Sequence, residues 1–443
     1  MKLVLAVLLN AGLLALLLPW LIRQWHWAGA GWWRTIFAVG LALRVVVGVA
    51  RSWVPKLDAQ FMTYLSTQVT ARLWSGPAEA ASLLFGSVNV FRITHADGTG
   101  YDAVYQGLSN TWYLIKILAL LNLASLETSW LNGLYLSLFA FVGCWQLVRK
   151  LAQVLPHTLP GAGVVAFLLW PSVWFWTTGI SKEAALLGSG AWLTAQVLDL
   201  LYGDVAGRRQ GWHWLGWGLL TAGLAYFHFK MRYFFAVPLL GVLAGVALGY
   251  WLQQLGLARY RWVQAGVMAA VLGLGIWLAP QLSTGFSANK FTNQVIKVYT
   301  FEVEHSVGKP HFEYPDLRPT LESMMAHAPL AVANVLTRPW LGESRQPTYI
   351  AAGLENAAIL SLLVLAVVAL ARGRGGHLPF ALGLGLVVFC LILAFLMGLT
   401  TPNLGSLNRY RSELVPFLLF LLLQNDYAAA LLRRVGLAGP SRS

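Results

Sequence analysis

Charged residues are scarce in this sequence of 443 residues, where Asp, Glu, Lys and Arg make up 11% against 58% hydrophobic residues. With a mean hydropathy of +0.63, the composition excludes a set of soluble domains. Because a membrane-spanning helix takes about 20 apolar residues, roughly eleven to thirteen spans would use over half of the chain. The sequence therefore predicts an all-α, polytopic transmembrane bundle with no room for a soluble catalytic domain.

Several diagnostic motifs are also missing. The only two cysteines, Cys144 and Cys390, both lie inside apolar runs, which excludes a disulfide framework and a cysteine metal site. The chain has no P-loop, no GxGxxG after a strand and no GxSxG motif. A process driven by a bound nucleotide is therefore disfavoured, and a lipid-linked or ion-driven process is favoured.

Acidic residues are few as well, 17 against 31 basic ones, which gives a formal charge of +14. A bilayer protein needs cationic loops to fix its orientation, so we expect no nucleic acid as a partner. Nine histidines show no metal-ligand spacing; His305 and His311 lie near carboxylates, but a solvated loop of mixed charge explains them better. We predict no metal site, and a divalent ion accompanying a phosphorylated substrate is the one cofactor left open.

Twelve apolar runs, bounded by charge or by Gly and Pro, are predicted to be membrane segments. They cover 3–22, 32–50, 105–124, 130–148, 161–178, 184–202, 212–229, 233–252, 262–280, 352–371, 379–399 and 412–432. The first run lacks a small-residue cleavage pattern and is read as a retained span, with a signal peptide as the alternative. The chain is accordingly divided into a transmembrane module 1–280 that includes the long loop 51–104, a non-cytoplasmic segment 281–350, and C-terminal transmembrane helices 351–443.

In the second half of the chain, every other loop is purely basic, which the positive-inside rule places in the cytoplasm. These loops carry Arg149-Lys150, Arg208-Arg209, Arg259 and Arg261, Arg372 and Arg374, and Arg433-Arg434. The loops between them then share the opposite face, where a site is expected. Counting spans backward puts the loop 51–104 in the cytoplasm, unless the segment 105–124 does not span. That segment is the suspect because it contains Lys116, a cation that is costly in mid-membrane.

Ten of the 17 acidic residues fall in the two long loops, where membrane-embedded catalysts commonly keep an acid or base at the aqueous boundary. They are Asp58, Glu79, Asp97, Asp102, Glu302, Glu304, Glu313, Asp316, Glu322 and Glu343. The stretch from Asp58 to Trp74 is predicted to form an interfacial amphipathic helix with Asp58 at or near its N-terminus. Asp58 is then either a helix cap or a functional carboxylate that acts as a general base, helps to bind a metal-diphosphate, or holds an acceptor hydroxyl.

Three cationic turns are the other candidates. At the first, Ser181 suits an N-cap and Glu183 a first helical turn, but Lys182 opposes the helix dipole unless an anion is bound nearby. The second turn carries Lys230 and Arg232, and the third Arg409 and Arg411. Each alone is more often an interfacial snorkelling cluster, but on one shared face the three are typical of a surface that binds a phosphorylated lipid head.

The order of these features resembles the polytopic bacterial glycosyltransferases of the GT-C type, which use polyprenyl-phosphate-linked sugars at the outer face of the cytoplasmic membrane. Within that group, the chain is similar to uncharacterised membrane proteins associated with surface polysaccharide. The resemblance rests on short pieces: Pro171-Ser172 to Ser181-Lys182-Glu183, Arg338-Pro339-Trp340 followed by Leu354-Glu355-Asn356, and Asn403-Leu404-Gly405 to Arg409-Tyr410-Arg411. The acidic pair often found early in such proteins is here a lone Asp58 followed by Ala59.

The resemblance implies a GT-C-like fold, a catalytic role for Asp58, and lipid-phosphate binding by Lys182, Lys230, Arg232, Arg409 and Arg411. Glu183 and Arg338, from the same pieces, complete the predicted substrate-binding set. The predicted function is transfer of a sugar from a polyprenyl-phosphate donor to a glycan, lipid or protein acceptor in a bacterial cytoplasmic membrane. The alternatives are a polysaccharide polymerase or ligase, a lipid-linked sugar transporter or flippase with Arg44 and Lys116 along its pathway, and a non-catalytic assembly subunit.

Overall fold

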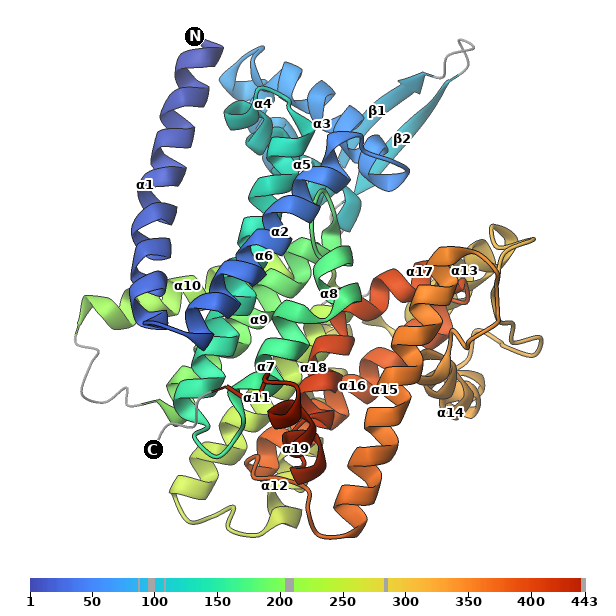
Figure 1. The fold of residues 1–443 in the computed structure, drawn as a ribbon. Coiled ribbons are helices and arrows are strands. Elements are labelled where there is room, and N and C mark those ends of the chain that lie inside the picture. Colours follow the sequence, from blue (N-terminus) through green and yellow to red (C-terminus); the bar gives the residue numbers. More distant parts are fainter. Residues whose placement is uncertain (87, 95–99, 107–108, 204–210, 283–285, 440–443) are drawn as a thin grey trace. The chain divides into compact units, whose positions relative to one another are not determined.

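The computed structural model describes residues 1–443 except 87, 95–99, 107–108, 204–210, 283–285 and 440–443 (Figure 1). Asp97 and the basic pair Arg208-Arg209 therefore lie outside the described residues. The chain divides into two compact units, each built from three stretches of sequence. Unit 1 consists of Met1–Val142, Thr177–Ser189 and Tyr226–Tyr233; unit 2 consists of Gly143–Trp176, Gly190–Ala225 and Phe234–Ser443.

The described part of the chain is almost entirely helical, and eight of its helices are long and apolar enough to cross a membrane. These are α1 (Lys2–Ala28), α2 (Trp32–Trp53), α6 (Ser129–Val154), α9 (Lys182–Tyr202), α11 (Tyr233–Gln254), α12 (Arg261–Leu282), α15 (Pro347–Ala371) and α16 (Phe380–Thr400). A ninth span results if α18 (Val415–Leu422) and α19 (Asp426–Arg434), which meet at a bend of 98°, are counted together. The prediction of an all-α, multi-pass membrane protein is confirmed, and eight or nine of the twelve predicted runs have the length and hydropathy of a span in the part of the chain that the structure describes.

Three of the predicted spans account for the lower number. The run 105–124 becomes α5 (Asn110–Ser125), only 16 residues long because Ser109 caps it late. The run 161–178 is broken into α7 (Pro160–Val164), the π-helix η1 (Val165–Leu169) and α8 (Pro171–Trp176), since Pro171 interrupts the backbone ladder. The run 212–229 becomes α10 (Trp212–Met231), which has the length of a span but is diluted by Trp, His and Gly.

Unit 1 contains the first long loop, which folds into α3 (Asp58–Leu73), α4 (Pro77–Phe85) and an antiparallel hairpin of β1 (Val88–Thr94) and β2 (Gly100–Gln106) (Figure 1). The helix predicted from Asp58 to Trp74 is thus confirmed. The hairpin is not predicted from the sequence. The hairpin rests on aromatic contacts: the fully buried Phe91 lies 5.0 Å, between ring centroids, from Trp112 of α5, and Tyr105 stacks on the same indole at 5.3 Å.

Unit 2 contains the second long segment, which forms α13 (Ala288–Glu304) and α14 (Leu321–Thr337), followed further on by α17 (Leu404–Tyr410) and the 3-10 helix η3 (Arg411–Glu413). α14 packs closely along α16, because Gly398 has no side chain and the backbone of Ala331 approaches where a Cβ would stand. The loop after α13 is held to the start of α17 by a bridge between His311 and Asn403. The segment therefore folds onto the spans and does not hang free.

Candidate functional site

The start of α9 has the local structure that its sequence predicts. Ser181 is the N-cap, since its Oγ accepts a hydrogen bond from Ala184 N at 3.1 Å. Gly179, two residues earlier, has φ of +71°, a conformation that favours glycine. Glu183, in the first turn, is buried. The chain turns at Gly179 and restarts as a helix whose first residue is Lys182.

Lys182 extends from this helix start to the first turn of α5. Its Nζ donates to Thr111 Oγ1 at 2.7 Å and to Asn110 Oδ1 at 3.2 Å. Both acceptors are neutral oxygens, which ligate a cation without cancelling its charge. Thr111 and Asn110 therefore hold the ammonium of Lys182 at the first turn of α5.

Two further lysines lie along the same part of α5. Lys230, near the end of α10, places its Nζ 5.9 Å from the ring centroid of Tyr113. Lys116 donates to the carbonyl of Leu84 at 2.7 Å, in the last turn of α4, where a helix dipole favours a cation. Burial lowers the pKa of Lys116, and the positive charge of Lys230 lowers this pKa further. We call Lys182, Lys230 and Lys116 the lysine cluster.

The surroundings of the lysine cluster are aromatic as well as cationic. The ring of Tyr113 lies edge-on to Phe227 at 5.9 Å, and Lys116 Nζ lies 5.3 Å from the centroid of Trp112. Tyr113 is partly buried, and burial raises its pKa. Like charges gathered in such a setting repel one another more strongly than in water, so the site favours an anion with an apolar attachment.

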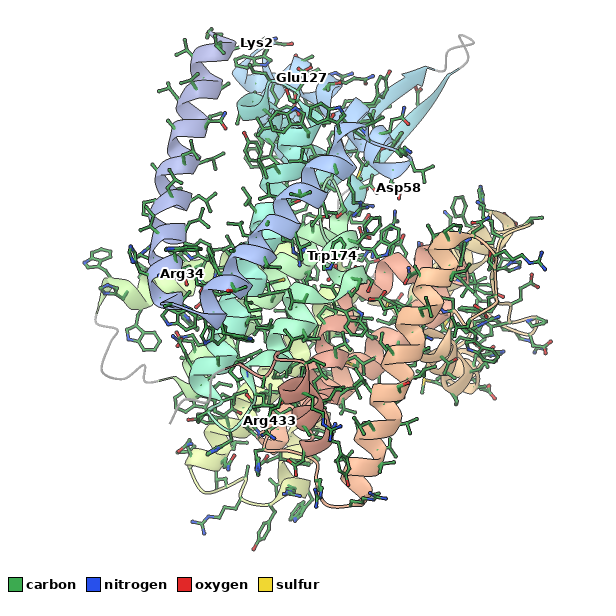
Figure 2. All side chains as sticks on the ribbon, in the orientation of Figure 1. Lys2, Arg34, Asp58, Glu127, Trp174 and Arg433 are labelled. Atoms are coloured by element: carbon green, nitrogen blue, oxygen red, sulfur yellow. The ribbon has the colours of Figure 1, made fainter. Side chains whose placement is uncertain are left out.

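Asp58, labelled in Figure 2, is the exposed first residue of α3. The N-cap position is held by Leu57, with φ of +51° and no side-chain capping bond, so Asp58 is not the capping residue of that helix. Arg232 is half-buried at the junction of α10 and α11, and its backbone N–H donates to His228 O. Neither residue belongs to the lysine cluster by a contact described above.

In unit 2, Arg411 is the centre of a buried polar network. Its Nη2 donates to Asn356 Oδ1 at 2.6 Å and its Nη1 donates to the backbone carbonyl of Arg338. Asn356 in turn donates to the carbonyls of Thr337 and Pro339. Burial lowers the pKa of Arg411 to about 10 and the carboxylate of Glu355 opposes this, so the guanidinium stays charged at neutral pH. Arg411 thus ties the loop between α14 and α15 to the end of α17.

The two other predicted arginines of unit 2 have partners of their own. The Nε of Arg338 donates to the carboxylate of Glu343, and its guanidinium lies 5.8 Å from the ring of Phe312. Arg409 is half-buried, donates to Tyr410 Oη at 3.1 Å and lies over the same ring. The structure therefore places both Lys182 and Lys230 against the first turn of α5 in unit 1, and it brings Arg338 together with Arg411 in unit 2.

Glu355 is a polar residue of this network that was not among the predicted site residues. Its Oε1 accepts from the backbone N–H of Ser172 at 3.0 Å, and it lies near the charge of Arg411. It joins Pro171-Ser172, Glu355-Asn356 and Arg411, three of the short pieces on which the family resemblance rests. The available signal was a carboxylate inside an otherwise apolar run, which is costly unless it is paired.

The loop that follows α13 contains a histidine with a shifted pKa. The carbonyl of Lys309 and the carboxylate of Glu313, whose Oε1 lies 2.8 Å from His311 Nε2, raise the pKa of His311 above 6.5. Partial burial and the charge of Arg338 act in the opposite direction. Over the described residues, no group of three or more His, Cys, Asp or Glu side chains is close enough to hold a metal ion.

The raised pKa of His311 predicts a weakening of this loop with rising pH. Because the folded pKa lies above the unfolded one, the stabilisation is complete below about pH 6.5 and is lost as pH rises through the folded value. We expect amide hydrogen exchange around 309–313, corrected for its intrinsic rate, to be about two- to fivefold faster at pH 8 than at pH 6. Glu313→Gln should reduce this difference without abolishing it, because the Lys309 carbonyl stays in place; an unchanged difference in that variant would contradict the assignment.

Comparison with known proteins gives no family for this chain. No protein-family model matches it, and neither the curated proteins nor the solved structures contain a significant match.

Proposed function

We propose that the protein is a membrane-embedded glycosyltransferase that moves a sugar from a polyprenyl-phosphate donor to an acceptor hydroxyl on a glycan, lipid or protein. The reaction would take place at the outer face of a bacterial cytoplasmic membrane. The observation that carries the proposal is the lysine cluster, three cations of unit 1 that lie on or against the first two turns of α5. The network around Arg411 would serve to hold the second long segment in place.

A lipid phosphate satisfies the physical requirements of the lysine cluster. Its negative charge would offset the repulsion between Lys230 and Lys116, and its prenyl chain would leave into apolar surroundings. Lys182 stands at the N-terminus of α9, where the helix dipole favours an anion and disfavours a cation alone. Lysine is suited to this task because its compact ammonium binds phosphate as a point charge.

The position of Asp58 supports a role as the general base. Arg51 Nη1 donates to Thr178 O at 3.1 Å, so the end of α2 lies beside the turn that leads to Lys182. Asp58 follows the end of α2 by five residues.

The proposed reaction is a substitution at the anomeric carbon of the sugar. The acceptor oxygen forms the new bond to this carbon, and the bond from the carbon to the phosphate oxygen breaks with its electron pair leaving on the phosphate. The acceptor proton passes to the carboxylate of Asp58, and the lysine cluster stabilises the charge that grows on the phosphate. No net oxidation or reduction is involved.

Donor binding tests the lysine cluster directly. With purified protein in nanodiscs and a C55 polyprenyl phosphate as the probe, we expect Lys230→Met to raise the dissociation constant about tenfold, because one charged contact with the phosphate is lost. Lys309→Met is the matched control, since Lys309 is exposed and its Nζ donates to the carbonyl of His305. Equal binding by Lys230→Met and wild type would refute the assignment.

A reconstituted assay separates a transferase from its alternatives. Proteoliposomes carrying the protein, a labelled lipid-linked sugar and an acceptor extract should yield a covalent product that bears one sugar. Movement of the labelled lipid across the bilayer without a product would instead indicate a transporter. Joining of whole repeat units would indicate a polymerase or ligase.

A further inference from the structure

Two helices of unit 1 interlock through small residues. Gly48 and Ser52 lie one turn apart on α2, and Gly133 and Ser137 lie one turn apart on α6. A Cβ at Gly48 would overlap Ser137 Oγ, and a Cβ at Gly133 would overlap Ser52 Oγ. Small residues at this spacing allow membrane helices to approach closely, so each serine is fixed against a glycine of the opposite helix.

The same two serines bind the turn that precedes α9. Ser137 Oγ accepts from the backbone N–H of Gly179 at 2.8 Å, and Ser52 Oγ accepts from that of Ile180 at 3.2 Å. Ser137 also donates its own hydroxyl hydrogen to Gly133 O at 2.6 Å, so the hydroxyl group acts both as a donor and as an acceptor. Ser52 and Ser137 are both buried.

Two arginines of α2 complete the binding of this turn. Arg44, a fully buried side chain, donates from Nη1 to Thr177 O at 2.6 Å, and Arg51 donates to Thr178 O. Each of the four consecutive residues from Thr177 to Ile180 therefore has one backbone group bound by a side chain of α2 or α6. Backbone groups outside regular structure need such partners when water is excluded.

The turn has little freedom to place Lys182 elsewhere. A Cβ at Gly179 would lie 2.7 Å from Ser52 Oγ, so the backbone passes directly against that hydroxyl. Only Ser181 separates Ile180 from Lys182, and Ser181 is itself fixed as the N-cap. The position of Lys182 against Thr111 is thus set by where α2 and α6 hold the preceding four residues.

We infer that Ser52 and Ser137 are positioning residues for donor binding, which act by holding the turn 177–180 so that Lys182 meets the donor phosphate. The inference rests on the proposed function. In this inference, the contact between α2 and α6 determines the position of Lys182, one cation of the lysine cluster.

The test measures binding of a C55 polyprenyl phosphate to protein in nanodiscs for Ser137→Ala, Ser52→Ala and Lys182→Met, singly and combined. We expect each serine variant to raise the dissociation constant about three- to tenfold. In the Lys182→Met background, Ser137→Ala should change it less than twofold, because the residue through which it acts is gone. Ser66→Ala is the matched control, since it removes a buried hydroxyl of unit 1 that contacts Asn122 and not the turn.

The outcomes are separable. The inference would be overturned if Ser137→Ala had the same effect on the dissociation constant with and without Lys182. It would also be overturned if both serine variants bound the polyprenyl phosphate as wild type does while Lys182→Met did not bind it. No binding of the probe by wild-type protein would instead refute the proposed function. If Ser137→Ala does not fold, as judged by gel filtration, Ser137→Cys keeps the size with a weaker acceptor and should give the same dependence on Lys182.

Discussion

Asp58→Asn is expected to lower the rate of sugar transfer by about 10²- to 10⁴-fold while leaving donor binding within about twofold of wild type. A positioned general base contributes this much to proton transfer, and an amide cannot accept the proton of the acceptor hydroxyl. Single-turnover transfer in proteoliposomes gives the rate, and the binding assay with polyprenyl phosphate gives the affinity. The two readouts separate a loss of chemistry from a loss of the donor.

The exposed position of Asp58 makes this variant informative. Asp58 is not the N-cap of α3, and Asn has the same size, so the helix should keep its fold and lose the interaction of a charge with its dipole, about 0.3–1 kcal/mol. Asp102→Asn, an exposed carboxylate on β2 of the same unit, is the control and should transfer at the wild-type rate. Transfer by Asp58→Asn at more than half of the wild-type rate would rule out the base.

Arg411→Met is expected to give the largest loss of stability, about 3–5 kcal/mol in the free energy of unfolding. The substitution removes the donors for Asn356 Oδ1 and for the carbonyl of Arg338, and it leaves the half-buried carboxylate of Glu355 without its neighbouring cation. Removing one charged member of a buried polar network costs more than replacing the whole network, because the remaining polar groups lose their partners. Denaturant unfolding of the detergent-solubilised protein, followed by tryptophan fluorescence, measures the change.

A double variant tests this explanation. Arg411→Met combined with Glu355→Gln should be more stable than Arg411→Met alone, because no uncompensated charge then stays buried. Arg345→Met, at an exposed position of the same loop, should change the free energy of unfolding by less than about 0.5 kcal/mol. If Arg411→Met were as stable as Arg345→Met, the network would not hold the loop.

Local patterns in the sequence predicted local structure well. Ser181 was expected to cap a helix, and it does; the stretch from Asp58 was expected to be helical, and it forms α3. In both cases the signal lies within a few residues of the element. The length of α5 was predicted wrongly because hydrophobicity does not reveal where Ser109 caps the helix.

Contacts between distant residues could not be predicted in the same way. Nothing in the residues around Ser172 shows that Glu355 accepts from its backbone, 183 positions away. The gathering of Lys182, Lys230 and Lys116 around α5 likewise depends on how helices pack. The sequence indicates Lys182 and Lys230 as members of cationic turns, and Lys116 as a costly charge in a predicted span. That all three lie on or against α5 depends on the tertiary structure.

The β1–β2 hairpin and the lysine cluster depend on neighbouring positions of one helix. The hairpin rests on Trp112 through Phe91 and Tyr105, while the residues on either side of Trp112, Thr111 and Tyr113, contact Lys182 and Lys230. A nanobody bound to the hairpin would therefore act on the first turn of α5 and, through it, on the residues that contact Lys182 and Lys230. The hairpin is therefore a surface through which a binding protein can affect the lysine cluster by way of α5.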